Sequence, residues 1–150
     1  MIIIGSDHAG IELKEKIINY FKKEHVEYLD VMQGVDQTGD DYPDVAKVIC
    51  LEVLKSKNNL GIAICGTGIG ISIACNKIKG IRAANCTDEM MAEMSRKHND
   101  ANILALGARL KFAEKFSNVE KIVNVFINTF FENGRHERRI EKITSLEGGN

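Results

Sequence analysis

"CGTGIGIS", residues 65–72, follows directly on the apolar run Leu60–Ile64 and contains a cysteine and three alternating glycines. A short apolar run of this kind is typical of a strand buried on both faces. After the glycines, apolar residues recur at helical spacing in Ile71, Ala74, Cys75 and Ile78. The stretch therefore predicts a buried strand that leads through a glycine loop into a helix, which is the building unit of parallel α/β sheets.

The same alternation of strand and helix patterns extends outward over most of the chain. Strands are predicted over Ile2–Ile4, Val26–Val31, Leu60–Ile64, Ile81–Asn85 and Asn102–Leu106. Helical patterns lie between them, over residues 10–24, 41–54, 71–78 and 88–97. This order predicts an α/β domain with a parallel sheet covered on both faces and right-handed crossovers. We find no linker or repeat, so residues 1–150 are expected to form a single domain.

Composition narrows the class of protein. The chain has 150 residues, and its 20 Lys and Arg nearly balance its 21 Asp and Glu. Such a balance argues against a nucleic-acid partner or a polybasic membrane surface. No apolar run approaches the ~18 residues of a membrane span. The four cysteines form no CxxC pair and no zinc-like spacing with the histidines, so neither a disulfide nor a metal framework is expected. A cytoplasmic protein is predicted.

The C-terminal third departs from the alternation. Apolar side chains recur there at steps of four and three, in Phe112, Phe116, Val119, Val123, Phe126 and Phe130. This spacing predicts one long helix with a narrow apolar seam, which Asn133 and Gly134 end before a further helix begins. Packing in the core is one explanation of the seam. A subunit interface is the other, because a domain of this size has limited interior to bury another long helix.

The glycine loop has a chemical interpretation as well as a structural one. Glycines at 66, 68 and 70 let backbone N–H groups approach an anion, and the helix that follows adds positive potential. The spacing matches neither the dinucleotide nor the Walker pattern, so a tight turn is the plain alternative. Helix dipole and N–H donors also favour the thiolate of Cys65. Cys50, Cys75 and Cys86 are interpreted as small buried apolar residues.

Polar residues after other predicted strands should reach the same edge of the sheet. Asp7 and His8 follow the first strand, and Arg109 follows the fifth. Asp7 could instead cap the next helix, and both roles could coexist. His98, followed by Asn99, ends a helix, where either a functional role or a favourable interaction with the helix dipole is possible.

Two arginines one turn apart indicate an anion site. Arg135 and Arg139 share a face at the start of the last predicted helix, where the dipole disfavours cations. A nearby anion would offset that cost, whereas a solvated basic turn is the alternative. A thiol base, a histidine, a set of N–H donors and several cations together suit aldose–ketose isomerisation of a sugar phosphate. In that reaction a base removes a proton beside a carbonyl, an enediolate forms, and the proton returns to the adjacent carbon.

Five motifs in this order and spacing closely resemble the ribose-5-phosphate isomerase B family, which also contains galactose-6-phosphate isomerase subunits. They are SDHAG (6–10), DYPD (41–44), CGTGIGISIACNKIKGIRAA (65–84), SRKHNDANILALGAR (95–109) and GRHERR (134–139). The resemblance covers nearly the whole chain. Its longest stretch without a family motif is 110–133, and the loop 32–40 is not diagnostic either.

The resemblance implies a role for each matching residue. Cys65 would be the base that moves the proton between C1 and C2, and His98 would assist ring opening. Asp7 would hold the sugar hydroxyls, and Asn99 would contact the substrate. Backbone and side-chain groups of the loop would stabilise the enediolate, through Gly66, Thr67, Gly68, Ile69 and Gly70. Phosphate-side positions are matched by His8, Arg109, Arg135 and Arg139. Some relatives use a glutamate base at the position of Ile71, which cannot take a proton, so Cys65 is the stronger assignment.

The resemblance also implies an architecture and an assembly. The family fold is a five-stranded parallel, Rossmann-like sheet in a three-layer α/β/α sandwich, and it works without metal or other cofactor. It forms a homodimer or a dimer of dimers with shared sites, to which the segment from about 111 to 145 would contribute. Cys65 and its loop would come from one chain, with His98, Asn99 and Arg109 from its partner.

These inferences predict interconversion of D-ribose 5-phosphate and D-ribulose 5-phosphate in the pentose phosphate pathway. Two alternatives stay open at this point. One is isomerisation of a six-carbon sugar phosphate such as allose or galactose 6-phosphate, which needs only a longer pocket. The other is a non-catalytic module that binds sugar phosphates, although competent residues at the acid, base and phosphate positions speak against it. The sequence does not decide between a dimer and a tetramer.

Overall fold

A five-stranded parallel sheet forms the centre of the molecule, as the alternating pattern predicts. The computed structural model describes residues 1–35 and 41–148. Its strands are β1 (Ile2–Ser6), β2 (Tyr28–Asp30), β3 (Leu60–Cys65), β4 (Ala83–Asn85) and β5 (Ile103–Gly107). They lie in the order β2-β1-β3-β5-β4, and each neighbouring pair is parallel. Three predicted strands begin too early, because Val26, Ile81 and Asn102 precede the ladders of β2, β4 and β5.

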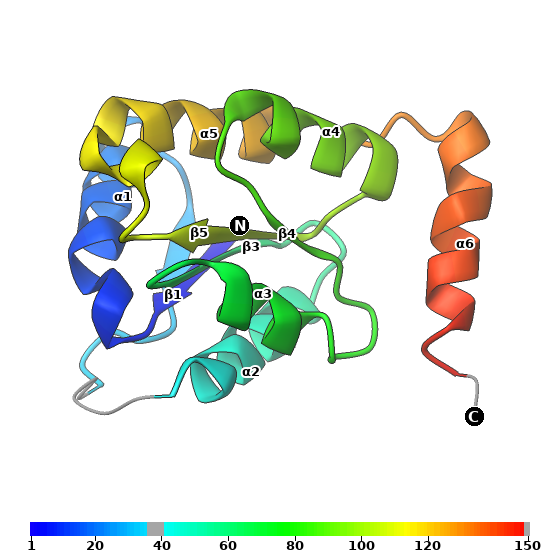
Figure 1. Ribbon diagram of the computed structural model, residues 1–150, viewed down its shortest axis with the longest axis horizontal. Helices are drawn as coiled ribbons and strands as arrows, with labels where there is room; N and C mark the ends of the chain where they lie inside the picture. The colour runs from blue at the N-terminus through cyan, green and yellow to red at the C-terminus, as the bar shows by residue number, and fades with distance from the viewer. Residues whose placement is uncertain (36–40, 149–150) are drawn as a thin grey trace.

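Helices cover both faces of the sheet and make the expected three-layer sandwich (Figure 1). One layer consists of α1 (Ile11–Lys23), α4 (Glu89–Asn99) and α5 (Phe116–Asn128), and the other of α2 (Tyr42–Val53) and α3 (Ile69–Cys75). The sheet separates two apolar clusters, because alternate residues of a strand point to opposite faces. In β3, Ile64 belongs to the α1 side and Cys65 to the α3 side.

The helix that carries the C-terminal apolar seam is shorter than the spacing of the seam residues predicts. Helix α5 spans Phe116–Asn128, whereas Phe112 lies in the short helix η2 (Lys111–Glu114). Phe130 follows the end of α5, and its side chain is 83% exposed. The prediction of one long helix is therefore wrong, because Thr129 is extended and its carbonyl accepts a hydrogen bond from Arg96.

Packing within the chain accounts for the middle of the seam. Val119, Val123 and Phe126 have no exposed surface and pack in the cluster on the α1 side of the sheet. Of the two explanations left open by the sequence, core packing therefore applies to these three residues. Phe130 alone among the aromatic members of the seam remains strongly exposed.

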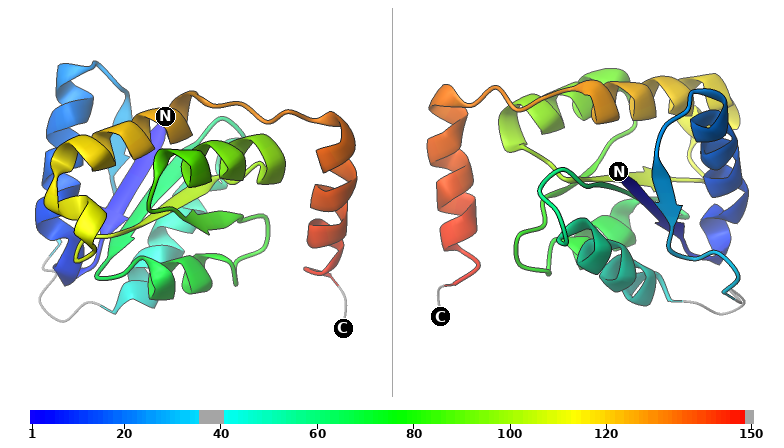
Figure 2. Two further views of the ribbon diagram at one scale, coloured as in Figure 1. Left: turned by 45° about the horizontal axis from the view of Figure 1, so that its top comes forward. Right: turned by 180° about the vertical axis from the view of Figure 1, so that it is seen from behind.

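The last helix, α6 (Glu137–Ser145), stands apart from the three layers (Figures 1 and 2). Asn133 and Gly134, both with positive φ near 60°, turn the chain into the short helix η3 (Gly134–His136) that precedes it. No residue of α6 is buried. Its C-terminal side is held to the body by a hydrogen bond from the Gly80 N–H to Glu147.

Two further points concern regions singled out in the sequence. Residues 36–40 of the loop 32–40 lie outside the described residues. Within the described ranges, every helix is too short or too polar to cross a lipid bilayer.

Candidate active site

Cys65 is the last residue of β3, and its thiol lies at the carboxyl edge of the sheet. The side chain is nearly buried, with 5% of its surface exposed. The Gly68 N–H donates a hydrogen bond to its Sγ over 3.2 Å. The sulfur of Cys65 is therefore held by the backbone of its own loop.

Close packing against the sheet fixes the shape of the glycine loop. Gly68 has φ of +75°, a conformation that side-chain-bearing residues rarely adopt. Gly107, at the end of β5, lies so close to the loop that a Cβ there would approach the backbone of Thr67 to 2.6 Å. Asn85, the last residue of β4, lies on the same side and its side-chain N–H donates to the Thr67 carbonyl over 3.5 Å. Three strand ends therefore hold the loop.

Asp7 follows β1 and lies beside the end of β3. Its backbone N–H donates to the Ile64 carbonyl over 3.1 Å, and its carboxylate accepts from the Ala9 N–H over 2.9 Å. The capping role and the edge position predicted for Asp7 are both confirmed, and its side chain is almost buried. The strands β1 and β3 are neighbours, but the loop after β1 leads to α1 on one face of the sheet and the loop after β3 leads to α3 on the other. Ligands of parallel sheets bind in the crevice between two such loops. His8 is exposed next to it.

Arg109 joins this group from the end of β5. Its backbone N–H donates to the Gly66 carbonyl over 2.9 Å. The guanidinium lies over the loop, with Nη1 3.4 Å from the position that a Cβ on Gly66 would occupy. We expected Arg109 to belong with His98, and this grouping is wrong within the chain. The positions of β5 and β3 next to each other in the sheet place Arg109 beside Cys65 instead.

A second group of predicted residues gathers around the end of α4. The imidazole of His98 stacks on that of His136, with ring centroids 4.3 Å apart and ring planes within 11°. The Glu132 carboxylate faces both rings, with Oε2 3.9 Å from His98 Nε2 and 3.6 Å from His136 Nε2. Arg135 donates to His136 Nε2 over 3.4 Å, and Arg139 follows one turn later on the exposed side of α6.

Side-chain contacts hold this second group in place. Arg96 of α4 donates to the carbonyls of Thr129 and Ala101, over 3.1 and 2.6 Å. The Glu132 N–H donates to the Lys97 carbonyl over 3.1 Å, which fixes the segment after α5 against the end of α4. Burial lowers the pKa of His136, and the nearby His98, Arg135 and Arg139 lower it further, whereas Glu132 acts in the opposite direction.

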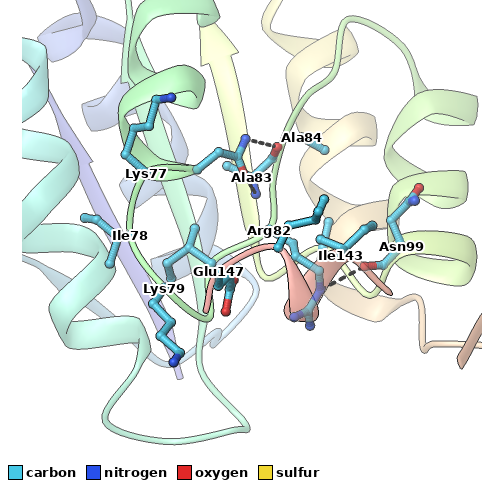
Figure 3. A pocket seen from close by; sticks show the side chains of 13 residues that line it. Lys77, Ile78, Lys79, Arg82, Ala83, Ala84, Asn99, Ile143 and Glu147 are labelled. Atoms are coloured by element: carbon cyan, nitrogen blue, oxygen red, sulfur yellow. Dashed lines mark hydrogen bonds between the residues drawn. The ribbon is translucent and has the colours of Figure 1, made fainter. Parts of the chain in front are cut away.

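Asn99, the last residue of α4, borders a cleft of about 630 Å³ between α6 and the segment that precedes β4 (Figure 3). Its carbonyl accepts a hydrogen bond from Arg82 over 3.0 Å. Ile143 and Glu147 close the cleft from the other side. The cleft lies at the amino ends of the strands, because Arg82 directly precedes β4 and Ala101 lies just before β5.

The predicted site residues thus form two separate groups within one chain. The Cys65 group lies at the carboxyl edge and comprises Asp7, His8, Cys65, the loop Gly66–Gly70 with Thr67 and Ile69, and Arg109. The His98 group lies beyond the amino edge and comprises His98, Asn99, Arg135 and Arg139. The two edges of the sheet are about 16 Å apart, which is the length of β3 at 3.3 Å per residue.

Three residues around these groups were not identified from the sequence. Asn85 ends β4, and its Oδ1 is buried without a hydrogen-bond partner among the described residues. Glu132 lies in the stretch without family motifs. His136 lies within GRHERR, so that motif was the available signal, but its spacing from His98 is too long for a local pattern to connect them.

Comparison with known proteins reveals a consistent set of relatives. The model of the family described as Ribose/Galactose Isomerase matches residues 2–143. Ribose-5-phosphate isomerase B of Escherichia coli is 40% identical over 146 residues, which cover 97% of this chain and 95% of that protein. A putative sugar phosphate isomerase of Rickettsia prowazekii is 46% identical over 142 residues, which cover 95% and 96% of the two chains.

Solved structures agree with these sequence relatives. Ribose-5-phosphate isomerase B of Mycoplasma genitalium, determined with bound ribulose-5-phosphate, superimposes with a TM-score of 0.90 at 41% identity. The match covers 99% of this chain and 97% of that one. The enzyme of Clostridium thermocellum gives a TM-score of 0.86 at 47% identity, and the match covers 97% and 96% of the two chains.

Proposed function

The chain belongs to the ribose/galactose isomerase family, and we propose on that basis that it interconverts D-ribose 5-phosphate and D-ribulose 5-phosphate. The observation that carries the proposal is the Cys65 group. A nearly buried thiol accepts a backbone hydrogen bond at the open end of a glycine loop, with a guanidinium directly over that loop. This arrangement offers a base, N–H donors for an oxyanion and a cation within one crevice.

The proposed reaction moves one proton from C2 to C1 and a second from the C2 hydroxyl to the C1 oxygen, with no net gain or loss of electrons. His98 assists opening of the sugar ring, which exposes the C1 aldehyde. The Cys65 thiolate then takes the proton from C2, and the electron pair moves to give an enediolate, whose negative oxygen accepts hydrogen bonds from the loop. The same proton returns from the Cys65 thiol to C1 and restores the thiolate, while the proton of the C2 hydroxyl passes to the C1 oxygen, which leaves a C1 hydroxyl and the C2 ketone. Asp7 holds the sugar hydroxyls, and the arginines hold the phosphate.

The separation of the two groups favours a site shared between two copies. Roughly 16 Å of sheet lies between Cys65 and the edge near His98, whereas a pentose phosphate must touch both residues. We therefore infer that the Cys65 group of one chain meets the His98 group of a second copy in a homodimer. In this arrangement Arg109 and Cys65 of one site come from the same chain, whereas Arg135 and Arg139 of that site come from the second copy.

Exposed apolar side chains support contact with a second copy on both sides. Next to the glycine loop, Ile69 and Ile73 of α3 are 56% and 57% exposed. Near the His98 group, Phe130 and Leu146 are 83% and 80% exposed. Burial of such apolar surface is favourable by about 25 cal/mol per Å². Because these side chains lie near the two groups, an interface that covers them would also bring the Cys65 group of one copy close to the His98 group of the other.

We place the activity in the cytoplasm and in the pentose phosphate pathway as part of the same proposal. Four free cysteines, one of them the proposed base, suit a reducing compartment in which a catalytic thiol stays reduced. The positions expected for a phosphate support a phosphorylated substrate over a free sugar.

The decisive experiment is a direct assay of ribulose 5-phosphate formed from ribose 5-phosphate, with EDTA present. We expect turnover of the phosphorylated sugar and poor turnover of ribose, because free ribose lacks the group that the arginines bind. Allose 6-phosphate, as a parallel substrate, measures the tolerance for a longer sugar. Binding of ribose 5-phosphate without any turnover would contradict the proposal and support a non-catalytic module.

A further inference from the structure

Three electron-pair donors converge in the His98 group, at a place that the proposed reaction does not fully explain. They are one nitrogen each of His98 and His136 and one carboxylate oxygen of Glu132, and these atoms lie within 4.8 Å of one another. His136 is 2% exposed, and its Nε2 is the nitrogen that faces Glu132. Two imidazoles and a carboxylate are a common ligand set for zinc.

The two distances to the Glu132 carboxylate are close to those that a zinc ion requires, and the two imidazole nitrogens lie within 4.8 Å of each other. With bonds of about 2.1 Å and tetrahedral angles, neighbouring ligand atoms lie about 3.4 Å apart. The Glu132 oxygen is 3.6 Å from His136 Nε2 and 3.9 Å from His98 Nε2. The backbone around these residues is already fixed by the hydrogen bond from the Glu132 N–H to the Lys97 carbonyl. Only side chains have to move when an ion binds.

The required side-chain movements are small and involve accessible groups. A metal lies in the plane of each imidazole that binds it, so the stacked rings must tilt apart. His98, whose side chain is 35% exposed, can tilt, whereas buried His136 stays in place. The exposed Arg135 must swing away from His136 Nε2. These costs, and the positive charge of Arg135 and Arg139, favour reversible binding of an added ion over permanent occupancy.

We propose that His98, Glu132 and His136 form an inhibitory Zn²⁺ site. The ion takes the lone pair of His98, which then cannot exchange a proton with the sugar ring. The sequence predicts no metal for folding or catalysis, and this site serves neither purpose. The inhibitory consequence rests on the proposed function, whereas binding of the ion does not.

A binding measurement tests the site independently of activity. Zn²⁺ is titrated into the full-length protein against a chromophoric chelator, and Co²⁺ serves as a probe whose visible absorption reports its coordination. We expect one ion per chain, and about a tenfold or greater loss of affinity in Glu132→Gln and in His136→Asn. His25→Asn is the matched control, because His25 is exposed elsewhere and has a positive φ that asparagine tolerates.

The four cysteines are competing ligands, so a thiol variant is part of the test. Cys65→Ala should bind Zn²⁺ like the native chain if the site is the one proposed. Loss of binding in Cys65→Ala, or unchanged binding in both Glu132→Gln and His136→Asn, would overturn it. Circular dichroism shows whether the variant of the buried His136 folds, and Glu132→Gln, at a half-exposed position, keeps the test decisive if it does not.

An activity measurement then tests the consequence. Zn²⁺ should inhibit ribose 5-phosphate turnover, EDTA should restore it, and Glu132→Gln should need about tenfold more Zn²⁺ for the same inhibition. The inhibition of each protein is expressed relative to its own rate in EDTA, because Glu132 faces His98 and its replacement can change the rate without Zn²⁺. If the native protein has no isomerase activity, the binding result still decides the site. Binding without inhibition would contradict the regulatory role alone.

Discussion

The two halves of the candidate site are built in opposite ways. Backbone holds the Cys65 group: Cys65 ends a strand, and the loop after it fits against Gly107 with almost no free space. Side chains hold the His98 group, in which Arg96 fixes the segment after α5 and two imidazoles stack under a half-exposed carboxylate. The sheet fixes the geometry of the Cys65 group, whereas the geometry of the His98 group depends on the side chains that pack around the end of α4.

This difference has a consequence for function. A loop shaped by three strand ends is rigid, which suits the proton transfer and the oxyanion. A group held by side chains at the margin of the fold can adapt to a second chain, which suits the half that must meet a partner. The two halves therefore predict different responses to substitution.

The largest effect should come from the thiol of the backbone-held half. Cys65→Ala should lower kcat by about 10²–10⁴-fold, because it removes the base, while substrate binding remains. Cys75→Ala is the matched control, since Cys75 is buried in the apolar cluster between α2 and α3 and has no proposed role. Steady-state kinetics of both variants give the comparison. A dead Cys75→Ala with an active Cys65→Ala would refute the assignment.

Mixing two inactive chains tests whether the halves come from different copies. If Cys65→Ala and His98→Ala chains are refolded together, each mixed dimer has one site with both lesions and one with neither. Random pairing makes half of the dimers mixed, so activity should recover to roughly a quarter of native.

Each variant refolded alone is the control for that experiment and must stay inactive. A tag on one chain shows whether mixed dimers have formed. Mixed dimers without activity would mean that Cys65 and His98 act in the same chain, and the shared-site proposal would be wrong.

The smallest of the three effects tests the packing of the loop. A methyl group on Gly107 would meet the Thr67 backbone at 2.6 Å, so Gly107→Ala must displace the loop. We expect a loss of about 1–3 kcal/mol in the free energy of unfolding, together with reduced kcat. Gly148→Ala, with no atom within 4 Å of the added Cβ, should change neither quantity. Denaturant unfolding and kinetics of both variants provide the measurement; an unaffected Gly107→Ala would show that backbone packing does not fix the loop.

Much of the fold and half of the site were predictable from local patterns. The run before Cys65 and the glycines after it indicate a strand, a loop and a helix in sequence order, and the structure confirms them. Asp7 and Cys65 follow strands, and the carboxyl ends of parallel strands meet at one edge, so their proximity follows from the pattern. Arg109 follows the same rule, although the grouping expected from the family resemblance placed it elsewhere.

The seam from Phe112 to Phe130 shows where periodicity fails. Spacing alone continues the helix past Asn128, but the Thr129 carbonyl accepts a hydrogen bond from Arg96, which comes from a different helix. Periodicity reports which side chains share a face. It does not report the hydrogen bonds that end a helix.

The sequence by itself determined the parallel sheet, its two covered faces and the residues at its carboxyl edge, because these depend on short-range periodicity and on where strands end. Only the tertiary structure decided that His98 lies beyond the opposite edge, stacked on His136 and facing Glu132. Those contacts join residues more than thirty positions apart in the chain. Their geometry depends on how α4 and the segment after α5 pack together, and no local pattern encodes that packing.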